Sequence, residues 1–165
     1  MKFEPFAMER LQSIWEHRVA WNLAESGVHA LRVEELVESA DDRQALLRQD
    51  LKYSQTNGTP ELRSLVAAMY GDATSAHVQI TNGGSEANFI TLAALVQPGD
   101  EVVVMTPNYM QVDGLSRALG AAVRPWPLVL DEADANERTP RWRPDVDALG
   151  PLVHERTRAV MICNP

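Results

Sequence analysis

Residues 81–88 read Thr-Asn-Gly-Gly-Ser-Glu-Ala-Asn, and this stretch joins two segments of different periodicity. Before it, the β-prone run at residues 77–81 predicts a short strand. After it, apolar residues recur at helical spacing and predict a helix over Ser85–Val96. A strand, a glycine turn and a helix in this order are typical of a parallel α/β unit, so this stretch indicates the fold class.

The same alternation continues downstream. The run Glu101–Met105 is apolar after its first residue, as expected of a strand buried on both faces of a parallel sheet. Further elements predicted by the pattern are a helix at 109–119, a strand at 120–127, a solvated loop at 131–143, a helix near 144–154 and a strand at 159–163. Repeated units of this kind require crossover connections, so we predict an α/β fold with a mostly parallel sheet and flanking helices.

The first third of the chain is more polar and predicts helices only. Apolar residues recur at helical spacing over Met8–Val19, and Arg32–Ala40 together with Arg43–Asp50 predict a second short helical region. Thr59 and Pro60 combine an N-cap with the first position of a helix that should run to about Tyr70. The composition changes near residues 50–58, which predicts an N-terminal helical arm over residues 1–50 and the main α/β domain over residues 51–165.

The composition is ordinary for a globular protein, with 165 residues, 45% of them hydrophobic and 23% charged. The formal net charge of −8 argues against a nucleic-acid binder. The single cysteine, Cys163, excludes an internal disulfide framework and a Cys-rich zinc site. The histidines are scattered without metal-ligand spacing, so we predict no metal site. Without a signal segment or a run of roughly 20 apolar residues, we expect a cytoplasmic protein with no membrane partner.

The turn at Gly83, Gly84 and Ser85 is the first candidate for a binding site. Glycines let the backbone approach a ligand closely, and the start of the following helix offers unpaired N–H groups and a positive dipole end, which together suit an anion such as phosphate. Two alternatives stay open on the residues alone: the glycines form only a tight turn, or Ser85 only caps the helix. Neither of the common nucleotide-binding glycine patterns occurs in the chain.

Two tyrosines are further candidates. Tyr109 follows the strongest predicted strand, where ligands gather in open parallel sheets, and its ring could lie flat against a planar ligand or simply cover the end of the sheet. Tyr53 lies in a polar loop that ends at Gly58, and by itself this indicates no more than a loop.

In combination, these segments resemble the amino-terminal part of the fold-type-I pyridoxal-phosphate enzymes, in particular the class I/II aminotransferases. The resemblance covers roughly residues 22–165. The matching pieces, in chain order, are Tyr53 with Gly58 five residues later, Pro60-Glu61-Leu62-Arg63 at a helix start, Gly83-Gly84-Ser85-Glu86-Ala87 after a strand, Pro98-Gly99-Asp100 before a Val-rich strand, Pro107-Asn108-Tyr109 after it, and Asn164-Pro165 after an apolar strand.

The resemblance implies a role for each candidate residue. The turn of Gly83, Gly84 and Ser85 would hold the phosphate of pyridoxal 5'-phosphate, and Tyr109 would stack on its ring. Tyr53 would reach the phosphate bound in the neighbouring subunit of a homodimer. Asn164 is the candidate for an asparagine that contacts the ring hydroxyl. The implied activity is transfer of an amino group between an amino acid and a 2-oxo acid.

The resemblance also implies that catalytic residues are missing. The family's Schiff-base lysine follows a later part of the sequence, and neither Lys2 nor Lys52 matches it. The chain corresponds to about the first two-fifths of such a subunit, with the cofactor-binding large domain truncated, and we expect it to be inactive alone. Val78–Thr81 should then fail to pair with Glu101–Met105, and an open apolar edge at Val160–Cys163 should leave the chain marginally stable or insoluble.

Other functions remain open at this point. A β-lyase, a decarboxylase or a cyclising synthase of the same fold type would share the phosphate turn and the stacking aromatic residue. A self-contained, non-catalytic α/β binding module is the alternative outside the enzymes.

Overall fold

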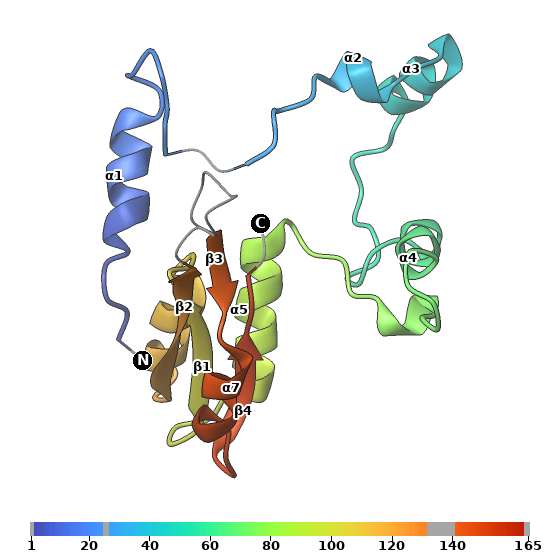
Figure 1. Ribbon diagram of the computed structural model, residues 1–165. Helices are drawn as coiled ribbons and strands as arrows, with labels where there is room; N and C mark the ends of the chain where they lie inside the picture. Colours follow the sequence, from blue (N-terminus) through green and yellow to red (C-terminus); the bar gives the residue numbers. More distant parts are fainter. Residues whose placement is uncertain (1, 25–26, 132–140, 164–165) are drawn as a thin grey trace. The chain divides into compact units, whose positions relative to one another are not determined.

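The computed structural model describes residues 2–24, 27–131 and 141–163. They fall into two compact units (Figure 1), one made of the chain up to Ala20 together with Asn82 onward, the other of Trp21–Thr81. In the described parts of the chain, no helix combines the length and the apolar character needed to cross a bilayer.

The first unit contains a four-stranded sheet in the order β3-β2-β1-β4. Its strands are β1 (Glu101–Thr106), β2 (Ala122–Asp131), β3 (Arg141–Pro144) and β4 (Thr157–Met161). β1 pairs in parallel with β2 and with β4, whereas β2 and β3 pair antiparallel. The prediction of an α/β fold with a mostly parallel, incomplete sheet is therefore confirmed.

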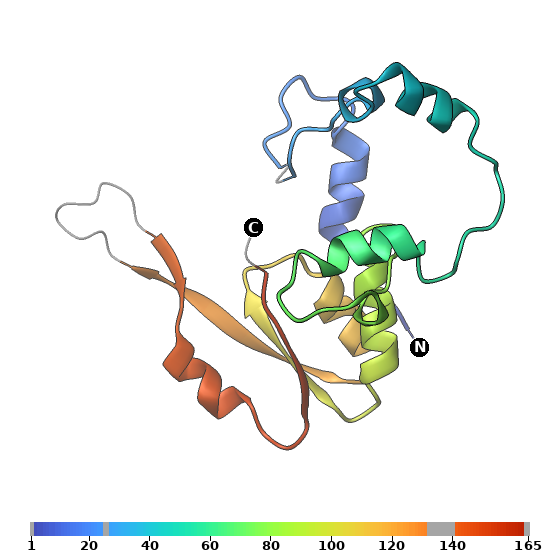
Figure 2. The same cartoon turned by 90° about the vertical axis from the view of Figure 1, so that its right-hand side faces the viewer.

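β1 is the buried centre of this sheet. Val102, Val103 and Val104 are completely inaccessible to solvent. Helices α5 (Gly84–Leu95) and α6 (Gln111–Ala118) cover one face, and α7 (Val146–Leu149) lies on the other, as Figure 2 shows. The prediction of a strand buried on both faces is confirmed.

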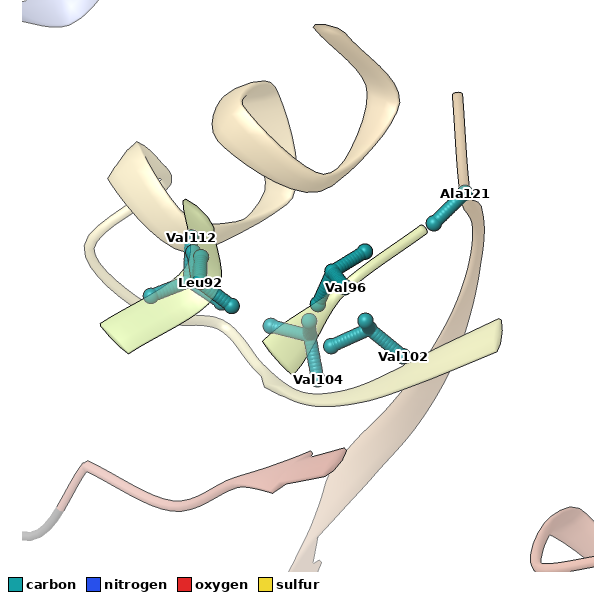
Figure 3. Close-up of a cluster of buried hydrophobic side chains, with 6 residues drawn as sticks. All are labelled: Leu92, Val96, Val102, Val104, Val112 and Ala121. Atoms are coloured by element: carbon teal, nitrogen blue, oxygen red, sulfur yellow. The ribbon is translucent and has the colours of Figure 1, made fainter. Parts of the chain in front are cut away.

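Two hydrophobic clusters fill the space on either side of β1. Figure 3 shows the cluster on the face that α5 and α6 cover. It consists of Leu92, Val96, Val102, Val104, Val112 and Ala121. The opposite face carries Val103, Met105 and Trp126, packed against Leu149 and Leu152. The Trp126 indole N–H donates to the Asp145 carbonyl oxygen at 2.7 Å, which ties this cluster to the start of α7.

The first unit also contains the α-helix α1 (Ala7–Trp15), which has no buried residue. It confirms the helix predicted at Met8–Val19, although it ends four residues earlier.

The second unit is helical. It contains α2 (Val33–Leu36), α3 (Ala40–Leu47), α4 (Pro60–Ala67) and the short 3₁₀ helix η1 (Ser75–His77). The Thr59 hydroxyl accepts the Leu62 backbone N–H at 3.3 Å, so the predicted N-cap with Pro60 behind it is confirmed.

The predicted strand at residues 77–81 is wrong. Residues 75–77 form η1, and Val78–Thr81 have no regular structure. A strand needs a neighbouring strand to pair its backbone groups, and here the Ile80 N–H donates instead to the Asn57 carbonyl oxygen of its own unit at 3.1 Å. The related prediction, that this segment does not pair with β1, is confirmed by the strand order.

In the last third of the chain, two elements differ from the predictions. The loop predicted at 131–143 lies largely outside the described residues, but Arg141–Pro144 form β3, a short, fully exposed strand with two arginines and a proline, which no run of apolar residues indicates. The helix predicted near 144–154 is only α7 followed by the 3₁₀ helix η2 (Gly150–Leu152). Pro151 lacks the N–H that an α-helix would need at this point.

Candidate functional site

The turn before α5 is fixed by the conformation of Gly83. This residue is the N-cap of α5, with φ 87° and ψ 170°, a region that other residues rarely enter. No side chain caps the helix. Ser85 is the second residue of α5 and not its N-cap, so the alternative in which Ser85 merely caps the helix is wrong.

The space beside the turn is open. A Cβ atom placed on Gly83 or on Gly84 would meet no other atom within 4 Å. The first N–H groups of an α-helix have no acceptor inside the helix, and the 12 residues of α5 align their peptide dipoles behind them. The start of α5 therefore has the N–H groups and the positive dipole end that suit an anion, and the Cβ side of both glycines is unobstructed.

Glu86 is the acidic residue closest to this turn in sequence. Its side chain is exposed, and its carboxylate accepts the Asn82 backbone N–H at 2.6 Å. The carboxylate thus folds back onto the turn and occupies the Asn82 N–H.

Tyr109 follows the carboxyl end of β1 and lies near the start of α5. It is 36% exposed, and its ring centroid lies 5.2 Å from that of Phe6, with the two planes at 52°. The pKa of Tyr109 is raised, first because burial disfavours the phenolate and then because the negative charge of the nearby Glu9 carboxylate disfavours it as well. The nearby Ser85 hydroxyl acts in the opposite direction and lowers that pKa.

Gln111 connects the two helices behind this site. Its side-chain carbonyl accepts from the Asn88 amide at 2.9 Å, and its own amide donates to the Ser85 carbonyl oxygen at 2.9 Å. The first turn of α5 is therefore tied to the first residue of α6.

The structure thus brings together four of the six residues predicted for the site. Gly83, Gly84, Ser85 and Tyr109 lie at one end of the sheet unit. Tyr53 belongs to the other unit and is fully exposed. Asn164 lies outside the described residues.

Three residues of this site were not predicted: Phe6, Glu9 and Gln111. The first two precede Tyr109 by about a hundred residues, and no local pattern indicates that they contact it. Gln111 looks like an ordinary polar residue of an amphipathic helix. Only the spatial neighbours of these residues indicate their roles.

Neither lysine of the chain is among these site residues. Lys52 is exposed, belongs to the second unit and pairs with Asp50 at 3.1 Å, and Lys2 is exposed near the amino terminus. The site therefore offers backbone N–H groups, a hydroxyl and a partly exposed aromatic ring, which are groups that bind an anion and a planar ring.

The chain matches a known family over most of its length. The pattern of the family "Aminotransferase class I and II" matches residues 21–165. A capreomycidine synthase of Streptomyces vinaceus is 38% identical over 108 residues, which are 66% of this chain and 26% of that protein. An aspartate/prephenate aminotransferase of Thermus thermophilus is 28% identical over 128 residues, which are 74% of this chain and 31% of that protein.

Solved structures agree with the family match. A PLP-dependent aminotransferase from Streptococcus suis superposes with a TM-score of 0.81 at 27% identity, over 97% of this chain and 42% of that one. An N-succinyldiaminopimelate aminotransferase from Mycobacterium tuberculosis gives 0.62 at 29% identity, over 72% of this chain and 30% of that one. This chain thus spans between 26% and 42% of the lengths of these relatives.

Proposed function

Because this chain belongs to the class I and II aminotransferase family, we propose that it supplies the phosphate-binding and ring-stacking part of a pyridoxal-phosphate site. The whole enzyme would transfer an amino group between an amino acid and a 2-oxo acid. The observation that carries the proposal is the meeting of Ser85 and Tyr109 beside the open turn at Gly83 and Gly84.

The residues present fit the cofactor. The N–H groups at the start of α5 and the Ser85 hydroxyl donate to a phosphate, and the open space beside Gly84 lets it approach the backbone. The partly exposed ring of Tyr109 packs on one face of the pyridine ring and orients it. When bound, the cofactor supplies the electron sink that makes the substrate's α-proton acidic.

The other predicted residues belong to the whole enzyme. In it, residues 51–165 form the first part of the cofactor-binding domain and follow the helical arm of residues 1–50 in the sequence. Tyr53, which is fully exposed, reaches the phosphate of a neighbouring subunit in a homodimer. Asn164 contacts the ring hydroxyl.

The reaction needs a base that moves the proton at the α-carbon. Neither Lys2 nor Lys52 belongs to the group of Ser85 and Tyr109. We therefore propose that the 165-residue chain binds the cofactor without transferring amino groups. Mixed with pyridoxal phosphate, an amino acid and a 2-oxo acid, it should form no new amino acid above the level given by free pyridoxal phosphate.

Cofactor binding is tested by equilibrium dialysis of the chain against pyridoxal 5'-phosphate, with inorganic phosphate as competitor. Ser85→Ala should weaken binding about tenfold, because it removes one hydrogen bond to a charged group. Ser64→Ala is the matched control, since Ser64 is also an exposed serine inside a helix. Equal affinity for the Ser85 and Ser64 variants, or no binding by the unmodified chain, would contradict the proposal.

A synthase reaction with the same cofactor is the second candidate. It is favoured by one observation: the identity to the capreomycidine synthase, at 38%, exceeds that to the aspartate aminotransferases, at 28–29%. The two candidates predict different products. Mass spectrometry of the products formed by the natural gene product from amino acids, with and without a 2-oxo acid, distinguishes them, because only amino transfer consumes the 2-oxo acid.

A further inference from the structure

Two hydrogen bonds of the Gln111 side chain join the two halves of the proposed site. Its amide donates to the Ser85 carbonyl oxygen at 2.9 Å. Its carbonyl accepts from the Asn88 amide, also at 2.9 Å. Ser85 and Asn88 lie among the first five residues of α5, whereas Gln111 is the first residue of α6 and follows Tyr109 by two positions.

The Ser85 carbonyl oxygen determines how these amides are oriented, because it can only accept. It faces the Gln111 NH₂ group, so the Gln111 oxygen is left to accept from the NH₂ group of Asn88. The reversed orientation would place two acceptor oxygens against each other. The Ser85 carbonyl has a second lone pair for the N–H four residues later in the helix. The bond from Gln111 does not use the Ser85 hydroxyl, whose proton remains for a phosphate.

Apolar packing fixes the helix that carries Gln111. Val112, the next residue, is buried and belongs to the same cluster as Leu92 of α5, as Figure 3 shows. The two helices are therefore held together by their core residues. Gln111 adds polar bonds between them where both helices begin, next to the phosphate-binding turn.

The turn at Gly83 and Gly84 has open space around it. An added Cβ on either glycine would meet no atom within 4 Å, and no side chain caps α5. The bond from Glu86 to the Asn82 N–H lies within the turn itself, whereas Gln111 ties the turn to another helix. The chain from Gln111 back to Tyr109 covers two residues and so spans at most about 7 Å. The same bond therefore limits how far the Tyr109 backbone can move from Ser85.

We propose that Gln111 is a positioning residue that sets the distance between the phosphate-binding turn at Ser85 and the ring-stacking Tyr109, and that Asn88 orients its amide. This inference rests on the proposed function. A ligand with both a phosphate and a planar ring gains from this fixed distance, because binding of one group favours the other only where the geometry allows both. A free phosphate does not depend on that distance.

The first experiment needs no ligand. Hydrogen exchange, followed by mass spectrometry, compares the original chain with Gln111→Leu and Gln111→Glu. Both variants lack the donor to Ser85, and the glutamate is favourable at the start of a helix, so this variant should fold even if the leucine variant does not. Exchange should become several times faster at residues 83–91 and at residues 107–115 together, because the two segments lose their connection.

Gln79→Leu is the matched control. Gln79 also donates from its side-chain amide to a distant backbone carbonyl, that of Thr56 at 3.2 Å, but it belongs to the other compact unit. Its replacement should leave exchange at residues 83–91 and 107–115 unchanged.

The second experiment compares two ligands by equilibrium dialysis. Pyridoxine 5'-phosphate carries the phosphate and the ring but no aldehyde, so it forms no imine with either lysine, and inorganic phosphate fills the phosphate subsite alone. Each Gln111 variant should weaken binding of pyridoxine 5'-phosphate about tenfold and binding of inorganic phosphate less than about threefold. A residue that only supports the fold would weaken both ligands by the same factor.

An equal loss of affinity for the two ligands, or faster exchange at residues 107–115 alone, overturns the inference. Absence of pyridoxine 5'-phosphate binding by the original chain contradicts the proposed function instead. The exchange result then decides by itself whether Gln111 connects the turn to the segment of Tyr109.

Discussion

Gly83 and Gly84 are adjacent, yet their backbone conformations differ, and so do their structural roles. Gly83 has a positive φ, which costs most residues about 1–3 kcal/mol, whereas Gly84 is helical and has free space beside it. Gly83→Ala should therefore destabilise the sheet unit by about 1–3 kcal/mol. Gly84→Ala should be neutral or stabilise it by up to about 1 kcal/mol, because alanine favours the helix.

Urea unfolding of both variants, followed by circular dichroism, measures this difference. Gly150→Ala serves as the control, since Gly150 also has a helical φ and no atom within 4 Å of an added Cβ. Equal destabilisation by the changes at residues 83 and 84 would show that the turn is not held by the conformation of Gly83.

Glu101 lies at the opposite end of β1 from Tyr109 and is the charged residue of the core. Its buried carboxylate is paired with Arg124, with Arg156 at 2.7 Å and with the His154 Nε2 at 2.9 Å. These partners, Arg124 first, hold the pKa of Glu101 below its ordinary value of 4.5. The group is therefore ionised in the folded protein at a pH where the unfolded chain is already protonated.

The sign of the resulting pH dependence follows from this shift. The stabilisation by Glu101 is complete above pH 4.5 and is lost as the pH falls through the lower pKa of the folded protein. Glu101→Gln should lower the free energy of unfolding at pH 6 and reduce its fall between pH 6 and pH 3. Urea unfolding of the original protein and of Glu101→Gln at pH 6 and at pH 3 measures this fall in the free energy of unfolding. An identical fall in both proteins would show that Glu101 does not cause the pH dependence.

At the residue scale, the sequence predicts best those site residues whose roles depend on their immediate neighbours in the chain. A glycine pair between a strand-like run and a helix indicates Gly83 and Gly84, and position after a buried strand indicates Tyr109. Glu9 and Gln111 act through neighbours that are distant in the chain, and neither residue type is unusual for a helix surface. Their roles therefore follow only from the folded arrangement.

At the element scale, the central strand β1 and the edge strand β4 differ in how deeply their side chains are buried. Val103 of β1 is fully buried, while its register partner on β4, Val160, is 38% exposed. Val103→Ala should lower the free energy of unfolding by about 2–3 kcal/mol, from lost transfer energy and a residual cavity. Val160→Ala should lower it by less than about 1 kcal/mol. Urea unfolding of the pair checks this, and equal effects would mean that β4 is covered in solution.

The elements that sequence predicted well are those that bury apolar residues inside the chain itself. β1 and α5 are of this kind, because each packs against the other within one unit. Val78–Thr81 has strand-like residues but lacks a partner strand among the described residues, so its propensity does not decide its structure. β3 shows the reverse case, since pairing with β2 makes a strand of a short, exposed segment that has no strand-like pattern.

At the scale of the whole molecule, the two units differ in how much core they have. Ala67 is the one buried hydrophobic residue among the described part of residues 21–81, and large side chains such as Leu51 and Val28 are almost entirely exposed there. Burial of apolar area is the main source of folding free energy. By itself the second unit therefore buries little of the apolar area that stabilises a folded domain, as expected if part of its surface contacts another subunit in the proposed homodimer.

The sheet unit has an unpaired side of its own, and this leads to the last prediction. Among the described residues, β4 pairs with β1 alone, and Val160 of β4 and Ile162 just after it are exposed. An open, apolar edge strand pairs readily with another chain, and a charge on it opposes such pairing. Val160→Lys should therefore shift the isolated 165-residue chain from self-associated species toward monomer, as measured by sedimentation velocity and light scattering over a range of protein concentrations. Arg158→Lys, an exposed change on the same strand that keeps the charge, is the control and should leave association unchanged. If the original chain is monomeric at every concentration, or if both variants associate alike, β4 is not the surface through which the chains meet.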